Sequence, residues 1–267
     1  MTLGEECRTE VATTGLTLRG LPQGQSAGRL VAQGRGNMTQ QLELLNNESH
    51  KNLLIRADAG VPHPNFVMVV IGEFPKAASS CPIFFAKDAA TGEFYAAALF
   101  GFQPGEILAD SAERGKADFH PLELQRQGFF ASDQNIAIDT GHPRFGAGAT
   151  LALFDEDGAP SNALRQIQRI IGQLATGVEA TKNFIRELLR LKLIEPVDIS
   201  LRFDDGESLS LDGLYTVSRE GLNDLDDSAI LALFRSGYLQ AALCMSFSLN
   251  QIPILAQRRN ERLIVAP

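Results

Sequence analysis

The spacing of apolar residues predicts one long helix in the second half of the chain. After Pro160 and Ser161, apolar residues recur every three or four positions, which places them on one helical face. These residues are Leu164, Ile167, Ile171, Leu174, Val178, Ile185 and Leu188, with Thr181 where the next apolar residue is due. The helix would run to about Leu193, a length of ~45 Å at ~1.5 Å per residue. We expect Pro196 to mark its end.

Before this helix, short apolar runs separated by turn residues predict strands. Residues 66–71 are rich in strand-forming side chains. Two further runs, at 82–87 and 93–102, flank a short turn that contains glycine, and this arrangement predicts a hairpin. Shorter strands are expected at 129–130, 136–138 and 150–154.

A second hairpin is expected directly after the long helix. Ile199, Leu201 and Phe203 alternate with polar residues, as in a strand with one buried face. Asp205-Gly206 suits a type I′ turn, in which both central residues have positive φ. The return strand would carry four apolar residues on one face, namely Leu209, Leu211, Tyr215 and Val217.

The last fifty residues predict helices. We expect Asp226 or Asp227 to cap a helix that ends at Ser236, with Gly237 as the stop signal. A final helix would begin near Tyr238, and Pro253 would kink or restart it. Strands, a long helix, a hairpin and further helices in this order predict an α+β fold, with an antiparallel, strand-rich N-terminal part packed against the long helix.

Composition adds limits on the class of protein. The chain has 267 residues, of which 44% are hydrophobic and 21% charged, as in ordinary globular proteins. Its 32 acidic and 24 basic residues give a net charge of −8, so we expect no nucleic-acid partner. Residues 1–37 contain seven glycines and no aromatic residue. We therefore expect 1–37 to be a disordered tail or a mis-assigned start, with Met38 as the alternative start, and 38–267 to form a single domain.

The cysteines and the apolar segments indicate in which cellular compartment the protein is located. Cys7, Cys81 and Cys244 are odd in number and have no CxxC spacing, so neither a disulfide framework nor a zinc site is predicted. The N-terminus lacks the continuous apolar region of a signal peptide. The apolar segment 238–255 is interrupted by polar residues, which favours a buried helix over a membrane span. We expect a cytoplasmic protein that is not an integral membrane protein.

Two hypotheses about function remain open. The chain contains no GxGxxG, GxxxxGK[ST] or GxSxG motif, and this favours a non-catalytic accessory protein that acts through protein contacts. The alternative is a small-ligand-binding protein or metal-dependent enzyme with a pocket around the irregular segment 110–148, since loops often carry function. Its candidate ligand-binding residues are Asp118, His120, Asp139, His142 and Arg144.

Three further points concern candidate sites. Glu73-Phe74-Pro75-Lys76 interrupts an apolar run; we expect a turn there, and the alternative is that the interruption places Glu73 in a cleft. Two histidines and a carboxylate could bind a metal, but no HxD or HxE spacing is present, so no metal or cofactor is predicted. Arg258, Arg259 and Arg262 form either a cationic helix end or a docking patch for an acidic partner.

Short motifs in a consistent order link the chain to a known family. From about 41 to 264 the chain resembles bacterial SapC-family proteins, which are unrelated to the peptide-transporter permease of the same name. The motifs in the first half are Leu45-Asn46-Asn47, Glu73-Phe74-Pro75, Cys81-Pro82-Ile83-Phe84-Phe85 and Ala98-Leu99-Phe100-Gly101. Those in the second half are Leu153-Phe154-Asp155-Glu156-Asp157-Gly158, Leu193-Ile194-Glu195-Pro196, Leu211-Asp212-Gly213-Leu214-Tyr215 and Ser236-Gly237-Tyr238-Leu239.

The resemblance implies a pathway rather than a mechanism. The family name is linked to surface-layer proteins, and members are often encoded near TonB-dependent receptors and flavin-dependent halogenases. This implies an accessory role around the uptake or modification of a substrate, with a protein partner, and it supplies no catalytic residues. The family tends to carry Trp and Tyr where this chain has residues 116–121, and this chain has no Trp at all.

Overall fold

The computed structural model describes residues 42–58, 63–109, 119–133 and 135–265. The expected tail at 1–37, the alternative start at Met38 and the candidate residue Asp118 lie outside these residues. Antiparallel sheets and helices make up the described part, which confirms the predicted α+β class.

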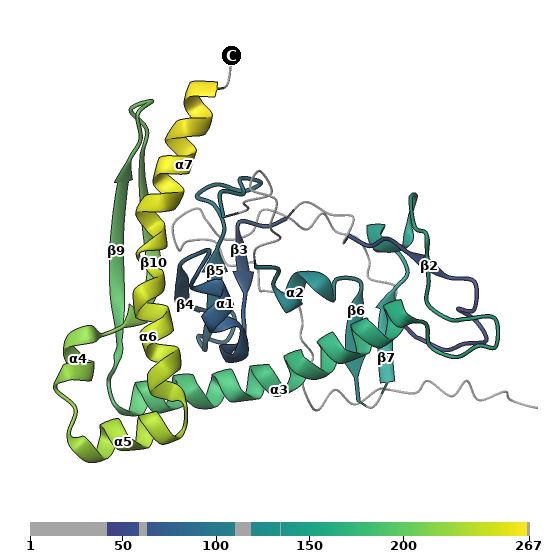
Figure 1. Ribbon diagram of the computed structural model, residues 1–267, viewed down its shortest axis with the longest axis horizontal. Helices are drawn as coiled ribbons and strands as arrows, with labels where there is room; N and C mark the ends of the chain where they lie inside the picture. Colours follow the sequence, from purple (N-terminus) through teal and green to yellow (C-terminus); the bar gives the residue numbers. More distant parts are fainter. Residues whose placement is uncertain (1–41, 59–62, 110–118, 134, 266–267) are drawn as a thin grey trace, which may run out of the picture.

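The larger sheet has five antiparallel strands in the order β3-β5-β4-β10-β9. The predicted hairpin before the long helix is β4 (Ile83–Lys87) and β5 (Phe94–Leu99), and β3 (Phe66–Met68) pairs with β5. The second hairpin, β9 (Ile194–Arg202) and β10 (Ser208–Val217), joins this sheet through β4. Strands that are distant in the sequence therefore share one sheet (Figure 1).

Two small sheets lie at the other end of the molecule. One has the order β1-β7-β6, from Leu42–Leu44, Asn135–Asp139 and Phe129–Ser132. The other pairs β2 (Leu54–Ile55) with β8 (Leu151–Ala152). The short strands expected near 129, 136 and 150 are thus confirmed, and a 3-10 turn, η3 (Pro143–Phe145), lies between the last two.

The long helix α3 (Asn162–Arg190) runs beneath both ends of the molecule (Figure 1). The Ser161 hydroxyl caps it by accepting a hydrogen bond from the N–H of Leu164. The N-terminal half of α3 packs into one hydrophobic cluster with the small sheets, and the C-terminal half packs into a second cluster with the larger sheet. A single helix therefore contributes to two cores.

The long helix ends close to the predicted Leu193, but Pro196 does not mark its end. The helix ends at Arg190, and Lys192 has a positive φ of 57°, which turns the chain directly into β9. Pro196 lies inside β9 instead of at the helix end. Proline is tolerated there because β9 is an edge strand, on which a missing N–H breaks no ladder bond on the free side.

The turn and register of the second hairpin also differ from the prediction. Gly206 has a positive φ of 84° but Asp205 does not, so the loop is a three-residue turn closed by glycine rather than a type I′ turn. A bulge between Leu211 and Leu214 then shifts the register against β9. Tyr215 therefore does not continue the face of Leu211, because the extra residue exchanges the two faces of the strand.

The strand expected at 66–71 is shorter than predicted. It ends at Met68, and the chain continues as a 3-10 turn, η1 (Ile71–Glu73), followed by the short helix α1 (Phe74–Ala77). The turn expected around Glu73-Phe74-Pro75 is present, in helical form. A second short helix, α2 (Leu122–Gln125), lies in the segment expected to be irregular.

The C-terminal helices begin and end near the predicted residues. After α4 (Arg219–Asn223), Asp226 caps α5 (Asp227–Arg235), and Gly237 ends it with a φ of 77°. The chain then forms α6 (Tyr238–Ser248) and α7 (Gln251–Val265), so that Pro253 lies in the first turn of a restarted helix.

The segment of α6 and α7 is buried on one side only. By length and composition, residues 238–263 would be apolar enough to cross a membrane, and 33% of the most apolar window is buried. Large apolar side chains on α5, α6 and α7 are exposed, including Phe234 at 69% and Phe247 at 55%. This segment therefore combines a buried side with large apolar side chains that are exposed.

Candidate functional site

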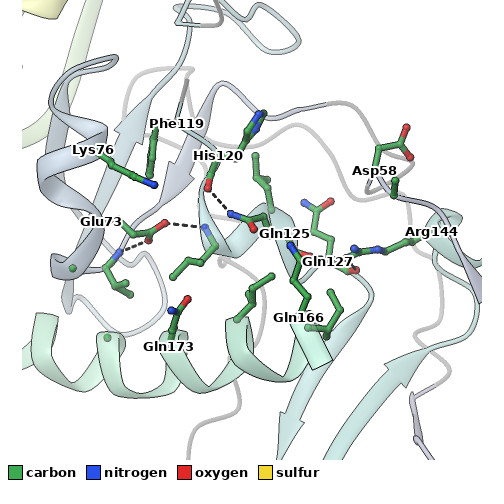
Figure 2. A pocket seen from close by; sticks show the side chains of 18 of the residues that line it. Asp58, Glu73, Lys76, Phe119, His120, Gln125, Gln127, Arg144, Gln166 and Gln173 are labelled. Carbon is green, nitrogen blue, oxygen red and sulfur yellow. Dashed lines mark hydrogen bonds between the residues drawn. The ribbon is translucent and has the colours of Figure 1, made fainter. Parts of the chain in front are cut away.

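A cavity of about 1350 Å³ lies between the middle of α3 and the segments that carry η1 and α2. Figure 2 shows side chains from these elements pointing into it. The lining comes from four separate parts of the chain, which are residues 55–58 with 63–76, residues 119–127, the region of Arg144 and Leu151, and residues 163–180.

One face of α3 forms the floor of the cavity. It combines apolar side chains, such as Ile167 and Ile170, with the amides of Gln166 and Gln173, which are seven residues apart and thus on the same face. From residue 163 to residue 180 this face extends ~25 Å, at ~1.5 Å per residue. The floor is therefore long, mostly apolar and edged with amides.

Glu73 lies at one end of the cavity and is only 8% exposed. Its Oε2 accepts a hydrogen bond from the N–H of Val70 (2.9 Å), and its Oε1 accepts one from the N–H of Leu122 (2.8 Å). The carboxylate thus ties η1 to the first turn of α2. Burial raises the pKa of Glu73, and the two backbone hydrogen bonds oppose this effect.

Thr181 of α3 holds η1 in place at the Glu73 end of the cavity. Its hydroxyl donates to the carbonyl of Gly177 (2.7 Å) and accepts from the N–H of Ile71 (2.8 Å). A threonine replaces the apolar residue that the pattern of α3 predicts here, because the first N–H of η1 needs a hydrogen-bond acceptor. At Gly177 a Cβ would lie 2.6 Å from Cγ2 of Val70, so α3 and η1 approach too closely for any side chain.

Arg144 lies at the other end and is only 6% exposed. Its Nη1 donates to the backbone carbonyls of Gln125 (2.6 Å) and Gln127 (3.0 Å), and its guanidinium lies 5.4 Å from the ring centre of Phe129. Desolvation lowers the pKa of Arg144, while the charge of Asp58 opposes this effect.

Two buried polar atoms at the Arg144 end have no hydrogen-bond partner among the described residues. One is the Nε donor of Arg144, and the other is the Oε1 acceptor of Gln127. Figure 2 shows the two side chains next to each other. Buried groups of this kind are rare and often indicate a site for a further molecule.

Aromatic and basic side chains complete the upper wall. The His63 ring lies 4.6 Å from that of Phe100, which also stacks on Phe119. The amide of Gln125 donates to the carbonyl of His120 (2.7 Å). Lys76 extends over the same end as Glu73 (Figure 2).

The structure brings three of the six candidate site residues into this cavity, namely Glu73, His120 and Arg144. The alternative in which the interrupted run places Glu73 in a cleft therefore applies together with the turn. Asp139 is not among the lining residues; it accepts from the N–H of Gly141 at the end of β7. His142 also lies outside the lining, and its Nδ1 accepts from the N–H of Arg144 at the start of η3.

Several lining residues were missed by sequence reasoning. Asp58, Lys76 and the glutamines of α2 and α3 carry no motif. One signal was present, because Gln166 and Gln173 flank Ile170 on a face of the long helix that would otherwise be apolar.

Three other candidate sites can be placed. Within the described ranges, no three His, Cys, Asp or Glu side chains are arranged to hold a metal ion. Cys81 is fully buried, and burial raises the pKa of its thiol. The C-terminal arginines are used mainly inside the fold: Arg259 pairs with Glu207 (2.6 Å) and lies over Phe203, and Arg258 donates to the carbonyl of Leu108.

Comparison with known proteins gives one match. A family model described as SapC matches residues 45–255, which is most of the chain and includes the described parts of the cavity lining. No curated protein and no solved structure gives a significant match.

Proposed function

The chain belongs to the SapC family, and we propose that it is a non-catalytic accessory protein that binds a small amphipathic ligand in the cavity above α3. The observation that carries this proposal is the cavity itself. Its volume of about 1350 Å³ exceeds the ~300–1,000 Å³ of ordinary ligand pockets, so it has room for a ligand and ordered water.

The chemistry of the lining supports binding rather than catalysis. Both carboxylate oxygens of Glu73 already accept backbone hydrogen bonds, which gives this residue a structural role. Arg144 is likewise held by two carbonyls, as is typical of a preorganised recognition group. The apolar floor of α3 offers contact area to a ligand, while the amides and charges at its edges fix the ligand's orientation.

The absence of tryptophan from the chain makes a clean binding test possible. The uncharged dye N-phenyl-1-naphthylamine is titrated into the wild type and into two variants, Gln173→Trp and Gln168→Trp. Both glutamines are exposed on α3, but only Gln173 lines the cavity. An indole at position 173 fills part of the cavity and should weaken dye binding at least tenfold. The indole at 168 is the matched control and should leave it unchanged.

The outcome has a clear meaning once folding is checked by circular dichroism. Equal dye binding in the two tryptophan variants would contradict a site above α3. The dye can also bind to the exposed apolar side chains of the C-terminal helices. A third variant, Phe247→Gln, weakens that binding and should leave the binding at the cavity unchanged.

A second candidate function rests on the exposed apolar side chains of α5–α7. This set, which we call the C-terminal apolar face, consists of Leu231, Phe234, Leu243, Phe247, Ile254 and Leu263. Exposed apolar groups mark protein interaction sites where they are neighbours, and Leu231 with Phe234 and Leu243 with Phe247 are three and four residues apart on their helices. We propose that this face binds a protein partner in the surface-layer or uptake-linked pathway that the family resemblance implies, in the cytoplasm.

Co-purification tests the second function. The wild type and the double variant Phe234→Gln/Phe247→Gln are expressed in the native cell at equal levels, and bound proteins are identified after crosslinking. A partner that is bound by the wild type and lost in the variant supports the proposal. A partner retained by the variant would place the interaction elsewhere on the surface.

A further inference from the structure

We propose that the cavity binds an amphipathic anion whose carboxylate pairs with Arg144 and whose neighbouring N–H or O–H group donates to Gln127. This inference rests on the proposed ligand-binding function and names the chemical class of the ligand. It is carried by the charge balance at the Arg144 end, by the two unpartnered atoms there and by the apolar floor that leads away from them.

The charge at this end is not balanced by the described residues. Asp58 is the acidic side chain of the lining at this end, and its carboxylate already accepts two hydrogen bonds from Arg56, at 2.6 and 3.0 Å. Asp58 also attracts Arg144, but two cations share this one carboxylate, so the group of Arg56, Asp58 and Arg144 has a net charge of +1. A buried cation whose contacts are carbonyls and an aromatic ring is stabilised further by an incoming anion.

The unpartnered atoms specify more than a charge. Within the part of the chain that the structure describes, Nε of Arg144 is a donor without an acceptor, and Oε1 of Gln127 is an acceptor without a donor. The two residues are immediate neighbours, since Nη1 of Arg144 contacts the carbonyl of Gln127 at 3.0 Å. One ligand group that carries both an acceptor and a donor satisfies both atoms, as the carboxylate and adjacent amide of an N-acyl amino acid do. Both atoms are shielded from solvent, so the flexible Gln127 side chain has to rotate as the ligand enters.

The rest of the cavity sets the direction of the ligand. Ile167 and Ile170 extend the floor from the Arg144 end towards Val70, and an acyl chain laid along them buries apolar area on both partners. At the far end the charge of Lys76 is accompanied by the buried carboxylate of Glu73, so that end has no excess positive charge for an anion. The anionic group therefore belongs beside Arg144 and the apolar chain along α3.

Three matched probes separate the two recognition elements. N-octanoylglycine carries the carboxylate and the N–H, N-octanoylsarcosine keeps the charge but replaces the N–H by N–CH₃, and N-octanoylglycinamide keeps the N–H but removes the charge. Isothermal titration of the full chain should give the tightest binding for N-octanoylglycine. We expect the glycinamide to bind at least tenfold more weakly, and the sarcosine several-fold more weakly.

Two variants connect these differences to the named residues. Gln127→Glu preserves shape and places a negative charge beside Arg144, so it should abolish the preference for N-octanoylglycine over its amide. Arg144→Lys should reduce the preference through loss of the Nε donor. Gln127 is only half-buried, so Gln127→Glu should fold. The test therefore stays valid if substitution of the buried Arg144 prevents folding.

The outcomes distinguish this inference from the function on which it rests. Binding of all three probes with equal affinity, blocked by Gln173→Trp, would overturn the inference and leave the ligand-binding function standing. A sarcosine probe that binds as tightly as the glycine probe would overturn the role of Gln127. No binding of any probe or of the uncharged dye would contradict both proposals.

Discussion

Gly172 and Gly177 lie five residues apart in α3, and the same substitution should have opposite effects at these two positions. A Cβ at Gly172 would meet no atom within 4 Å, and the site is exposed. A Cβ at Gly177 would lie 2.6 Å from Cγ2 and 2.8 Å from Cβ of Val70. Contacts this short cannot be relieved by rotating the valine side chain, because its Cβ is itself too close.

The magnitudes follow from helix propensity and packing. Alanine is favoured over glycine in a helix by ~1 kcal/mol, so Gly172→Ala should stabilise the protein by about that amount. Gly177→Ala gains the same propensity but overpacks a site where the cost is typically ~1–3 kcal/mol. Val70 is buried, and its N–H is held by Glu73, which places the cost near the upper end of that range. We expect a net loss of ~2 kcal/mol, and thus a difference of ~3 kcal/mol between the variants.

Urea unfolding followed by circular dichroism measures this difference. The double variant Gly177→Ala/Val70→Ala supplies the control, because removing the valine methyl groups removes the shortest contact, at 2.6 Å, and leaves only the one with Cβ of residue 70. The double variant should lose less stability than the sum of the two single variants. Equal stabilisation by alanine at both glycines would refute the close packing of α3 against η1.

Further predictions concern the supports of the cavity and the thiols. Thr181→Val leaves the first N–H of η1 without its acceptor and should cost ~1–3 kcal/mol, whereas Thr181→Ser should retain most of the stability in the same urea assay. Because burial raises the pKa of Glu73 above 4.5, the folded state holds this proton more tightly than the unfolded state. The stability of the wild type relative to Glu73→Gln should therefore be greatest below about pH 4.5 and fall as the pH rises through the folded pKa, and a flat difference between the two unfolding free energies across pH 4–7 would contradict this. In a Cys7→Ser background, iodoacetamide should label the half-buried Cys244 before the fully buried Cys81, and mass spectrometry of native protein checks the order.

Local signals explain why much of the fold could be predicted. The start of α3 at Ser161 and the break at Gly237 each depend on a few adjacent residues, so a single sequence contains the necessary information. Pro196 was misinterpreted because its tolerance depends on β9 being an edge strand, which is a property of the sheet. The bulge between Leu211 and Leu214 was hidden because both strand faces carry apolar residues near it.

The cavity could be anticipated only in part. Glu73 was singled out because it interrupts an apolar run, and His120 and Arg144 because they lie in the irregular segment 110–148; all three line the cavity. The glutamines on α3 carry no motif, and nothing local shows that α2 covers the face on which they lie. A site assembled from four distant segments is specified by long-range packing, and spacing within one segment does not reveal it.

The contribution of α3 to two cores has a consequence for how this family can vary in length. Each residue of a helix adds ~1.5 Å and ~100° of rotation. One residue inserted between Leu174 and Phe184 would turn the face that packs with the small sheets away from the face that packs with the larger sheet. Relatives should therefore gain or lose residues freely in their loops, but within the middle of this helix only in steps of about seven, the shortest insertion that restores both faces.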